Sequence, residues 1–319
     1  MEIKEFIEKK LNELKPTDKK VVDFKSQKDL IDYIYKALLN KKFRKFSIGQ
    51  ETKDKIRKAV ELNVVKNEPI KIAIAFGCYK LWKFEECPEP DWAELFYMMY
   101  CAKWLMPIAE VYKPGVWFDF CGEDVILGLM NNIPEDDIEK YKEIFRNLLK
   151  FIKPYLPENF KYTFSPVGER YASREEFLAD FNDKLEEIKM KNLAPLTENE
   201  KKTIELNIKP IKGEEIDFKK TRLLHDAYMN ISKRRSYHKT PEKISVSSTL
   251  WGTSIPIGTT KTSVVKFQTG VGILKKNGDS FVEYIYSPSQ LESAYFTKEN
   301  IHIERLEGKN FKMIKVITN

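Results

Sequence analysis

The distribution of apolar and polar residues divides the chain into stretches of different periodicity. Up to residue 66 the sequence is highly charged, and apolar residues such as Ile31, Ile34 and Leu38 recur at helical spacing. From residue 67 to 192, apolar runs of strand length alternate with longer helical patterns, and residues 193 to 216 are polar and contain two prolines. We therefore predict an N-terminal helical segment (1–66), a core (67–192), a linker (193–216) and a C-terminal α+β portion (217–319) that completes the site.

The core has the pattern of strands that alternate with helices. Strands are predicted at Ile70–Phe76, Val116–Cys121 and Lys161–Val167, and helices at residues 91–111, 135–152 and 173–190. Alternation at these lengths implies right-handed crossovers and a parallel sheet that is covered on both faces. The predicted fold class is α/β, with a Rossmann-like, mostly parallel sheet and an N-terminal helical cover.

The C-terminal portion changes from helix to strand. A helix is predicted at residues 217–235, followed by strands at 244–248, 264–274 and 281–286, and the last two flank an Asn277-Gly278 turn typical of hairpins. Two more strands are predicted at residues 301–305 and 311–317. We expect an antiparallel β portion at this end of the chain.

Two glycines mark the carboxyl ends of the first two core strands, Gly77 and Gly122. In an open α/β sheet the carboxyl ends of the strands form the crevice in which ligands bind, so we expect chemistry here. Tyr79, Lys80 and Lys83 follow the first glycine, and Glu123 follows the second. Asp91 and Glu94 open the next helix with the spacing of a capping box, which explains these two acids equally well without a function.

Composition narrows the class of protein. The chain has 319 residues, of which 42% are hydrophobic, and its 55 basic and 48 acidic residues are mixed along the sequence and give a net charge of +7. These values indicate a globular protein and make nucleic acid an unlikely partner. The start of the sequence lacks a signal-peptide pattern and no apolar run is long enough to cross a membrane, so we expect a cytoplasmic protein without membrane contact. The four cysteines form no close pair, no motif requires a metal or a cofactor, and buried free thiols are expected.

Several short motifs follow one another in the order seen in a known family. They are a lysine after Phe76, Pro90-Asp91-x-x-Glu94, Tyr112-x-Pro114-Gly115, Cys121 with Glu123, Asp137-Ile138 with Tyr141, Arg234-Arg235, Ile244-x-Val246-Ser247, and Lys266-Phe267 with Thr269. Over about two thirds of its length the chain resembles the pyoverdine/dityrosine biosynthesis family of isonitrile (isocyanide) synthases. The resemblance rests on the order of these motifs, since none is decisive alone.

The resemblance implies a Rossmann-like enzyme of secondary metabolism that converts the amine of an amino acid to an isonitrile with a carbon from ribulose 5-phosphate. Such a condensation needs proton-transfer groups, a cationic clamp for phosphate and a pocket for the amino acid. The catalytic candidates are Glu123, Asp91, Glu94 and Lys80. The substrate-binding candidates are Gly77, Tyr79, Lys83, Gly122, Arg170, Arg234, Arg235, Ser247, Lys261, Lys266 and Thr269. Many members of the family work beside a partner iron-dependent oxygenase, and assembly as a homodimer is left open.

Two features of the sequence motivate other interpretations: histidines that the family has and this chain lacks, and its basic, aromatic composition. The family has histidines in two segments that read Ser245-Val246-Ser247-Ser248 and Thr269-Gly270-Val271-Gly272 in this chain. The first alternative is therefore a non-catalytic relative that binds small molecules and has lost these histidines. The basic charge and the aromatic content motivate the second, an RNA-binding or RNA-modifying protein.

Overall fold

The computed structural model describes most of the chain. It covers residues 2–15, 22–44, 46–78, 80–83, 88–191, 193–209, 215–247, 254–258, 270–287, 290, 300–305 and 312–317. Side chains are outside the description at 82, 83, 199, 203, 206, 207, 300–305 and 312–317. Part of the predicted strand 264–274 falls outside these ranges.

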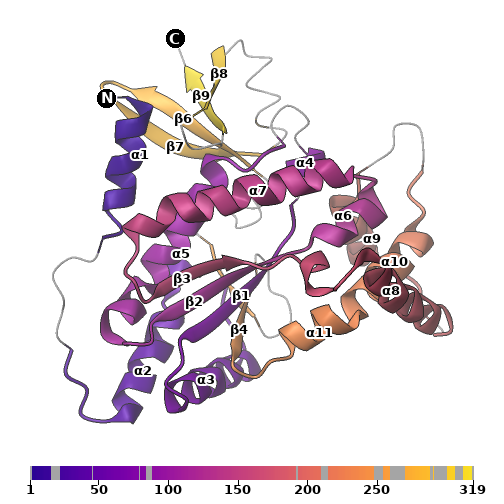
Figure 1. Cartoon of the computed structure of the whole chain (residues 1–319), viewed down its shortest axis with the longest axis horizontal. Coiled ribbons are helices and arrows are strands. Elements are labelled where there is room, and N and C mark those ends of the chain that lie inside the picture. Colours follow the sequence, from indigo (N-terminus) through magenta and orange to yellow (C-terminus); the bar gives the residue numbers. More distant parts are fainter. Residues whose placement is uncertain are drawn as a thin grey trace.

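A five-stranded parallel sheet forms the centre of the molecule (Figure 1). Its strands are β1 (Ile70–Phe76), β2 (Val116–Gly122), β3 (Phe160–Phe164), β4 (Lys243–Ser247) and β5 (Ile255–Pro256), in the order β3-β2-β1-β4-β5. The chain therefore builds outward from β1 on one side and then returns to place β4 on its other side. This order confirms the predicted Rossmann-like α/β fold, and it makes the carboxyl ends of β1 and its neighbours the switch point where ligands bind in such sheets.

The ends of β1 and β2 lie side by side, as expected for Gly77 and Gly122. Phe76 is in register with Gly122, and the backbone N–H of Glu123 donates to the carbonyl of Phe76 at 3.0 Å. A Cβ atom on Gly122 would lie 2.7 Å from the Phe164 ring and 3.2 Å from Cα of Pro166, so a larger residue at the end of β2 would have to displace this ring. Gly122 lies beside the end of β3, where its N–H donates to the carbonyl of Ser165, and the chain turns directly into Glu123.

Helices cover both faces of the sheet. On one face, Phe120 of β2 packs with Tyr97 of α5 (Trp92–Val111) and Phe145 of α7 (Glu135–Ile152), and Phe118 packs beside Phe120. On the other face α3 (Gln50–Val65) contacts β1 and β4, and Figure 1 shows α7 above and α3 below the strands. The helices α1 (Ile3–Asn12) and α2 (Gln27–Leu38), with the short 3-10 turns η1 (Lys41–Phe43) and η2 (Lys153–Tyr155), complete this core.

A second hydrophobic core lies beyond the carboxyl end of β2. It is built by η3 (Gly168–Arg170), α6 (Asp124–Asn131), α8 (Arg174–Lys189), α10 (Phe218–Asn230) and α11 (Ser232–His238), with α9 (Glu198–Asn207) beside α10. Its buried residues include Cys121, Val167, Phe177 and Tyr228. This core thus packs α10 and α11, which precede β4, against the end of β2.

Three local features differ from the sequence prediction. The predicted helix 217–235 is two helices, because the backbone of buried Ile231 is extended (ψ 144°) and ends α10 before α11 begins. Helix α6 was not predicted, since an eight-residue apolar run with Gly128 inside it has no helical period long enough to detect. The predicted linker contains α9, which begins at a capping box formed by Thr197 and Glu200. The domain boundaries themselves stay a prediction.

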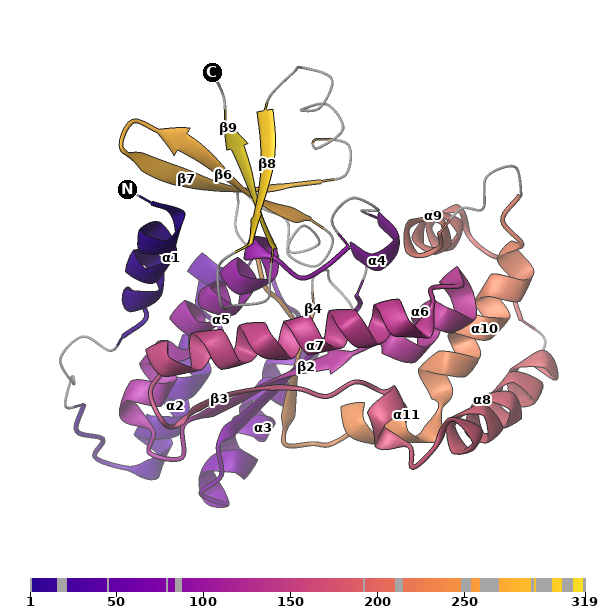
Figure 2. The ribbon, with the colours of Figure 1, turned by 45° about the horizontal axis from the view of Figure 1, so that its top comes forward.

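The C-terminal strands form a separate sheet. Its order is β7 (Ser280–Tyr286), β6 (Val271–Asn277), β9 (Lys312–Ile317) and β8 (Asn300–Arg305). The β6–β7 and β8–β9 pairs are antiparallel, as predicted for this end of the chain, while β6 and β9 pair in parallel. Figure 2 shows this sheet above α5, beside α1. None of the helices within the described ranges has the length and apolar character needed to span a membrane.

The contact between this second sheet and α5 depends on Gly272. A Cβ atom there would lie 2.5 Å from Cβ of Trp92 and 2.6 Å from the backbone nitrogen of Ala93. Its backbone N–H also donates to the carboxylate of Asp91 at 3.1 Å. The absent side chain therefore lets β6 lie directly on the first turn of α5.

We expect Gly272→Ala to lower the free energy of unfolding by about 1–3 kcal/mol, because backbone atoms must move to admit the methyl group. Gly128→Ala is the matched control, since Gly128 is exposed within α6 and the new Cβ would lie at an ordinary contact distance of 3.9 Å from the carbonyl oxygen of Ile133. That control should raise stability by about 1 kcal/mol through helix propensity. Urea unfolding measures both, and an unchanged or higher stability of Gly272→Ala would show that the second sheet does not lie so close to α5.

Candidate functional site

A buried ion pair stands at the carboxyl end of β2. The carboxylate of Glu123 accepts from Nε of Arg234 at 3.0 Å and from its Nη2 at 3.1 Å, and the hydroxyl of Tyr228 also donates to it. Burial raises the pKa of Glu123, but the guanidinium and the phenol outweigh burial and leave the pKa below its usual value. Glu123 is therefore a fixed anion, and β2 is tied through it to α10 and α11.

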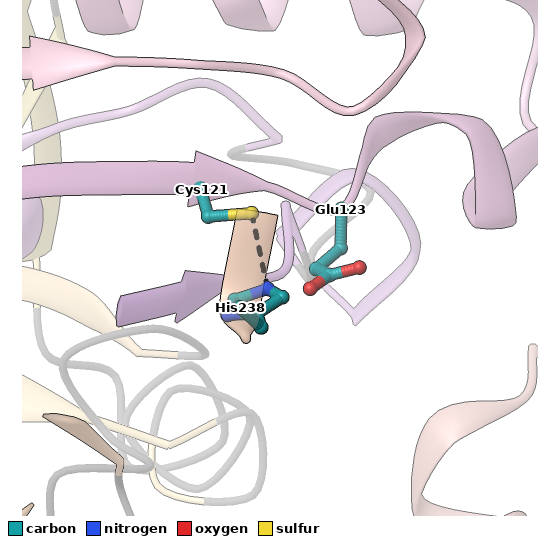
Figure 3. A group of neighbouring side chains, drawn as sticks. All are labelled: Cys121, Glu123 and His238. Atoms are coloured by element: carbon teal, nitrogen blue, oxygen red, sulfur yellow. Dashed lines mark hydrogen bonds between the residues drawn. The ribbon is translucent and has the colours of Figure 1, made fainter. Parts of the chain in front are cut away.

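Cys121 and His238 lie next to this ion pair. The Sγ atom of Cys121 is 3.5 Å from Nε2 of His238, and Figure 3 shows Glu123 on the same side of the strand end. Burial raises the pKa of the Cys121 thiol to about 12. Burial, together with the charge of Arg234, lowers the pKa of His238 to about 4, so this imidazole is neutral at pH 7.

Arg170 lies on the other side of the thiol. Its Nη2 donates to Sγ of Cys121 at 3.0 Å and to the carbonyl of Ser165 at 2.8 Å, and its guanidinium lies 3.7 Å from the centre of the Tyr237 ring. Its Nη1 atom is buried and has no hydrogen-bond partner among the residues that the structure describes. A buried N–H without an acceptor costs about 1–3 kcal/mol, so a ligand oxygen that accepts from Nη1 would recover this free energy.

A polar patch continues from Arg170 along the same face of β2. The hydroxyl of Tyr237 donates to Asp119, which also accepts from Thr163 and Ser165. The ammonium of Lys243 lies 3.0 Å from the centre of the Tyr237 ring, and burial lowers its pKa to about 8. This face of the sheet therefore holds two cations, Arg170 and Lys243, beside the Tyr237 ring.

A second buried network surrounds Lys80 of α4 (Lys80–Lys83). Its ammonium contacts Asp91 and Glu94 at 2.6 Å each, and the hydroxyl of Tyr141 donates to Glu94 at 3.1 Å. Asp91 and Glu94 also form the expected capping box of α5. Since two carboxylates share one ammonium in a fully buried place, desolvation raises the pKa of Glu94 to about 7. This network pins α4, α5, α7 and β6 together.

Cys78 and Asp124 lie close to both strand ends. The Cys78 thiol is fully buried after Gly77, and burial together with the charge of Asp124 holds its pKa well above the usual value. Asp124 accepts from the backbone N–H of Gly168 at 3.1 Å and lies 3.5 Å from Nζ of Lys142. Cys78, Cys101 and Cys121 are free and buried, which agrees with the sequence expectation for these three thiols.

The structure places the predicted site residues in different surroundings. It brings Lys80, Asp91 and Glu94 into one network, and Glu123, Arg170 and Arg234 into another. Gly77 and Gly122 lie at neighbouring strand ends. Arg235 is exposed, and Ser247 at the end of β4 accepts from the hydroxyl of Ser254 at 2.6 Å. Outside the description are Tyr79, the side chain of Lys83, Lys261, Lys266 and Thr269.

Sequence reasoning missed His238. Nothing in the sequence pairs this histidine with another residue, whereas the fold carries it across 117 residues of sequence to the Cys121 thiol. The one available signal was its position just before the strand that pairs with β1. This position identifies Cys121 as a partner of His238 only when it is known that β4 lies next to β1 in the sheet.

A cavity among the described residues lies elsewhere. It is lined by residues of the α1 end and of α5, including Glu13, Lys103, Met106 and Glu110. It contains none of the predicted site residues, so it does not change the choice of site.

Comparison with solved structures finds proteins of similar fold. The chain resembles the crystal structure of the PvcA protein from Pseudomonas aeruginosa, with a TM-score of 0.59 and 15% identity over 91% of this chain and 99% of that one. No family model and no curated protein matches the sequence. At this identity the similarity establishes the fold. The shared fold agrees with the family that the sequence resembles, but it does not identify a substrate or a reaction.

We expect Arg234→Met to lower the free energy of unfolding by about 3–5 kcal/mol, because it leaves the Glu123 carboxylate buried without a counter-charge. Arg235→Met is the matched control, since the neighbouring arginine is exposed and its replacement should change stability by less than about 0.5 kcal/mol. Urea denaturation gives both values. Equal effects of the two replacements would mean that the ion pair with Glu123 does not form.

Glu94 should make stability depend on pH. Its pKa rises from 4.5 to about 7 on folding, so the folded chain binds more protons than the unfolded chain between these values. The stabilising contribution is complete below pH 4.5 and is lost as the pH rises through 7. The difference in unfolding free energy between wild type and Glu94→Gln should therefore shrink from pH 5 to pH 8. A difference that grows over this range would show that Glu94 is an anion in the folded chain.

Proposed function

We propose that the chain is a biosynthetic enzyme of the isonitrile synthase type, which condenses the amine of an amino acid with a phosphorylated ketose such as ribulose 5-phosphate. Two independent lines support this proposal. The order of short motifs resembles that family, and the fold is similar to that of PvcA over most of both chains. The polar side chains that the proposal needs gather at the carboxyl ends of β1 and β2, where ligands bind in sheets of this order.

The unused Nη1 of Arg170 is the observation that carries the proposal. Guanidinium groups bind phosphate and carboxylate through paired, charge-assisted hydrogen bonds. Arg170 already uses Nη2 for Cys121 and Ser165, which fixes its orientation, while Nη1 keeps its hydrogen-bonding capacity. We assign Arg170 to the phosphate of the ketose or to the carboxylate of the amino acid.

The two buried acids differ in charge state, which suggests different roles. Glu123 is held as an anion by Arg234, so it suits the positioning of a cationic or hydroxyl-bearing substrate group. Glu94 has a pKa of about 7, which matches proton exchange at neutral pH. In the proposed first step the amine nitrogen attacks the ketose carbonyl carbon, the carbonyl π bond opens, and a proton passes from nitrogen to a carboxylate. We assign that proton transfer to Glu94.

Turnover tests the proposal directly. Incubation of the chain with pooled amino acids and ribulose 5-phosphate, followed by mass spectrometry, should reveal a new product that contains the amino acid and a carbon from the ketose. Glu94→Gln should lower kcat by about 100-fold or more. Arg170→Met should raise KM for the ketose phosphate or for the amino acid. Arg174→Met, which replaces an exposed arginine paired with Glu135, should leave kcat and both KM values close to those of the wild type.

Two results would contradict this function. Substrate binding without any turnover would favour a non-catalytic relative that binds small molecules. Retention on heparin that falls steeply with salt, combined with no effect of ribulose 5-phosphate, would favour an RNA-binding protein.

A further inference from the structure

Three side chains with metal-ligating atoms converge at the end of β2. Cys121 is in the strand, Glu123 follows it, and His238 ends α11 (Figure 3). Their thiol, carboxylate and imidazole ligand atoms all lie within 4.8 Å of one another. Cys121 and Glu123 are buried and His238 is half-buried, so water competes little for these atoms.

The spacing of the donor atoms is close to that of a tetrahedral zinc site. With Zn–S and Zn–N bonds of about 2.3 and 2.1 Å, the two donors of a tetrahedral site stand about 3.6 Å apart. The observed separation of Sγ of Cys121 and Nε2 of His238 is 3.5 Å. The Glu123 carboxylate has to approach by about 1 Å to complete the set.

Glu123 retains a position for a metal bond. A carboxylate has about four lone-pair positions. Three donors compete for them, namely Nε and Nη2 of Arg234 and the hydroxyl of Tyr228. The single Nε–H is shared between the two oxygens at 3.0 and 3.3 Å, so one position is only weakly used. Partners of this kind are common around metal sites, where they fix the orientation of a ligating carboxylate.

The surrounding charges select the kind of ion. Binding converts the Cys121 thiol to a thiolate and releases its proton to solvent, so the thiolate and Glu123 supply two negative charges. Arg170 and Arg234 supply two positive charges beside them. The donor set is therefore not strongly attractive to a hard cation such as Mg²⁺ or Ca²⁺. Bonds from sulfur and imidazole nitrogen have to carry the affinity, and these donors prefer zinc and similar ions.

We propose that Cys121, Glu123 and His238 form a binding site for one zinc ion. Three protein ligands leave a fourth position open, as in zinc sites that bind water or a substrate. Tyr228 and Arg234 orient the carboxylate, and the N–H of Arg170 supports the thiolate. The site does not depend on the proposed condensation, because it follows from the donor atoms alone.

Cobalt is the spectroscopic probe for this site. Titration of the purified chain with Co²⁺ should produce a thiolate-to-cobalt charge-transfer band that saturates at one equivalent. Zn²⁺ should abolish the band, and a large excess of Mg²⁺ should leave it unchanged. Equilibrium dialysis with elemental analysis gives the zinc stoichiometry without any measurement of activity.

Matched variants assign the ligands. Cys121→Ser should abolish the band, and His238→Gln should weaken binding of Zn²⁺ by more than tenfold. Tyr228→Phe, which removes only an orienting hydroxyl, should weaken it by about tenfold. Cys101→Ser and His225→Gln are the controls, since Cys101 is buried within α5 and His225 lies on α10 beside Asp226. Both controls should bind like the wild type.

Circular dichroism and the urea midpoint show whether each variant is folded, and Tyr228→Phe keeps the test decisive if a ligand variant unfolds. Failure of the folded wild type to bind zinc would overturn the proposal. Equal zinc affinity of the wild type and the folded Cys121→Ser, His238→Gln and Tyr228→Phe variants would overturn it as well.

Discussion

The ion pair between Glu123 and Arg234 is the interaction on which the arrangement of the site depends. The two residues are 111 positions apart, and both are buried. Removing two charges from water is costly, and only close, multiple hydrogen bonds recover that cost. Arg234 supplies two N–H groups and Tyr228 a hydroxyl, so the carboxylate is held from two helices at once. The same contact positions α11 and brings His238 to Cys121.

Buried charge is the common property of the two networks at the strand ends. Around Lys80, two carboxylates face one ammonium, and burial, together with the charge of Asp91, raises the pKa of Glu94. Around Glu123, arginines outnumber the nearby acids, and the pKa of Glu123 falls. The two glutamate carboxyls thus differ in pKa because their surroundings differ. An acid and a base with separated pKa values are what proton transfer at neutral pH requires.

The sequence predicts the fold well because its strongest signals are long and local. The apolar runs of β1 and β2 and the long period of α7 are recognisable without tertiary information, and their alternation implies a parallel sheet. Helix α6 and the break at Ile231 are not recognisable, because the first is too short for a period and the second is stabilised by burial in a core that forms only in the folded chain. The pairing of β6 with β9 is a long-range contact of the same kind.

The candidate site also has one part that the sequence predicts and another that only the fold reveals. Gly122, Glu123 and the capping box at Asp91 are visible in the sequence, because each is defined by its position at the end of one element. The contacts between these residues and their partners are not visible. Tyr228 and His238 come from segments distant in sequence, and Arg170 and Arg234 are sequence candidates whose partners only the fold reveals.

Hydrogen–deuterium exchange with and without ribulose 5-phosphate tests most directly whether the end of β2 is the functional centre. The account predicts that the ligand slows exchange in peptides from β2, η3 and α11, and leaves α2 and α3 unchanged. Slower exchange confined to other elements, or no change at a saturating ligand concentration, would contradict it.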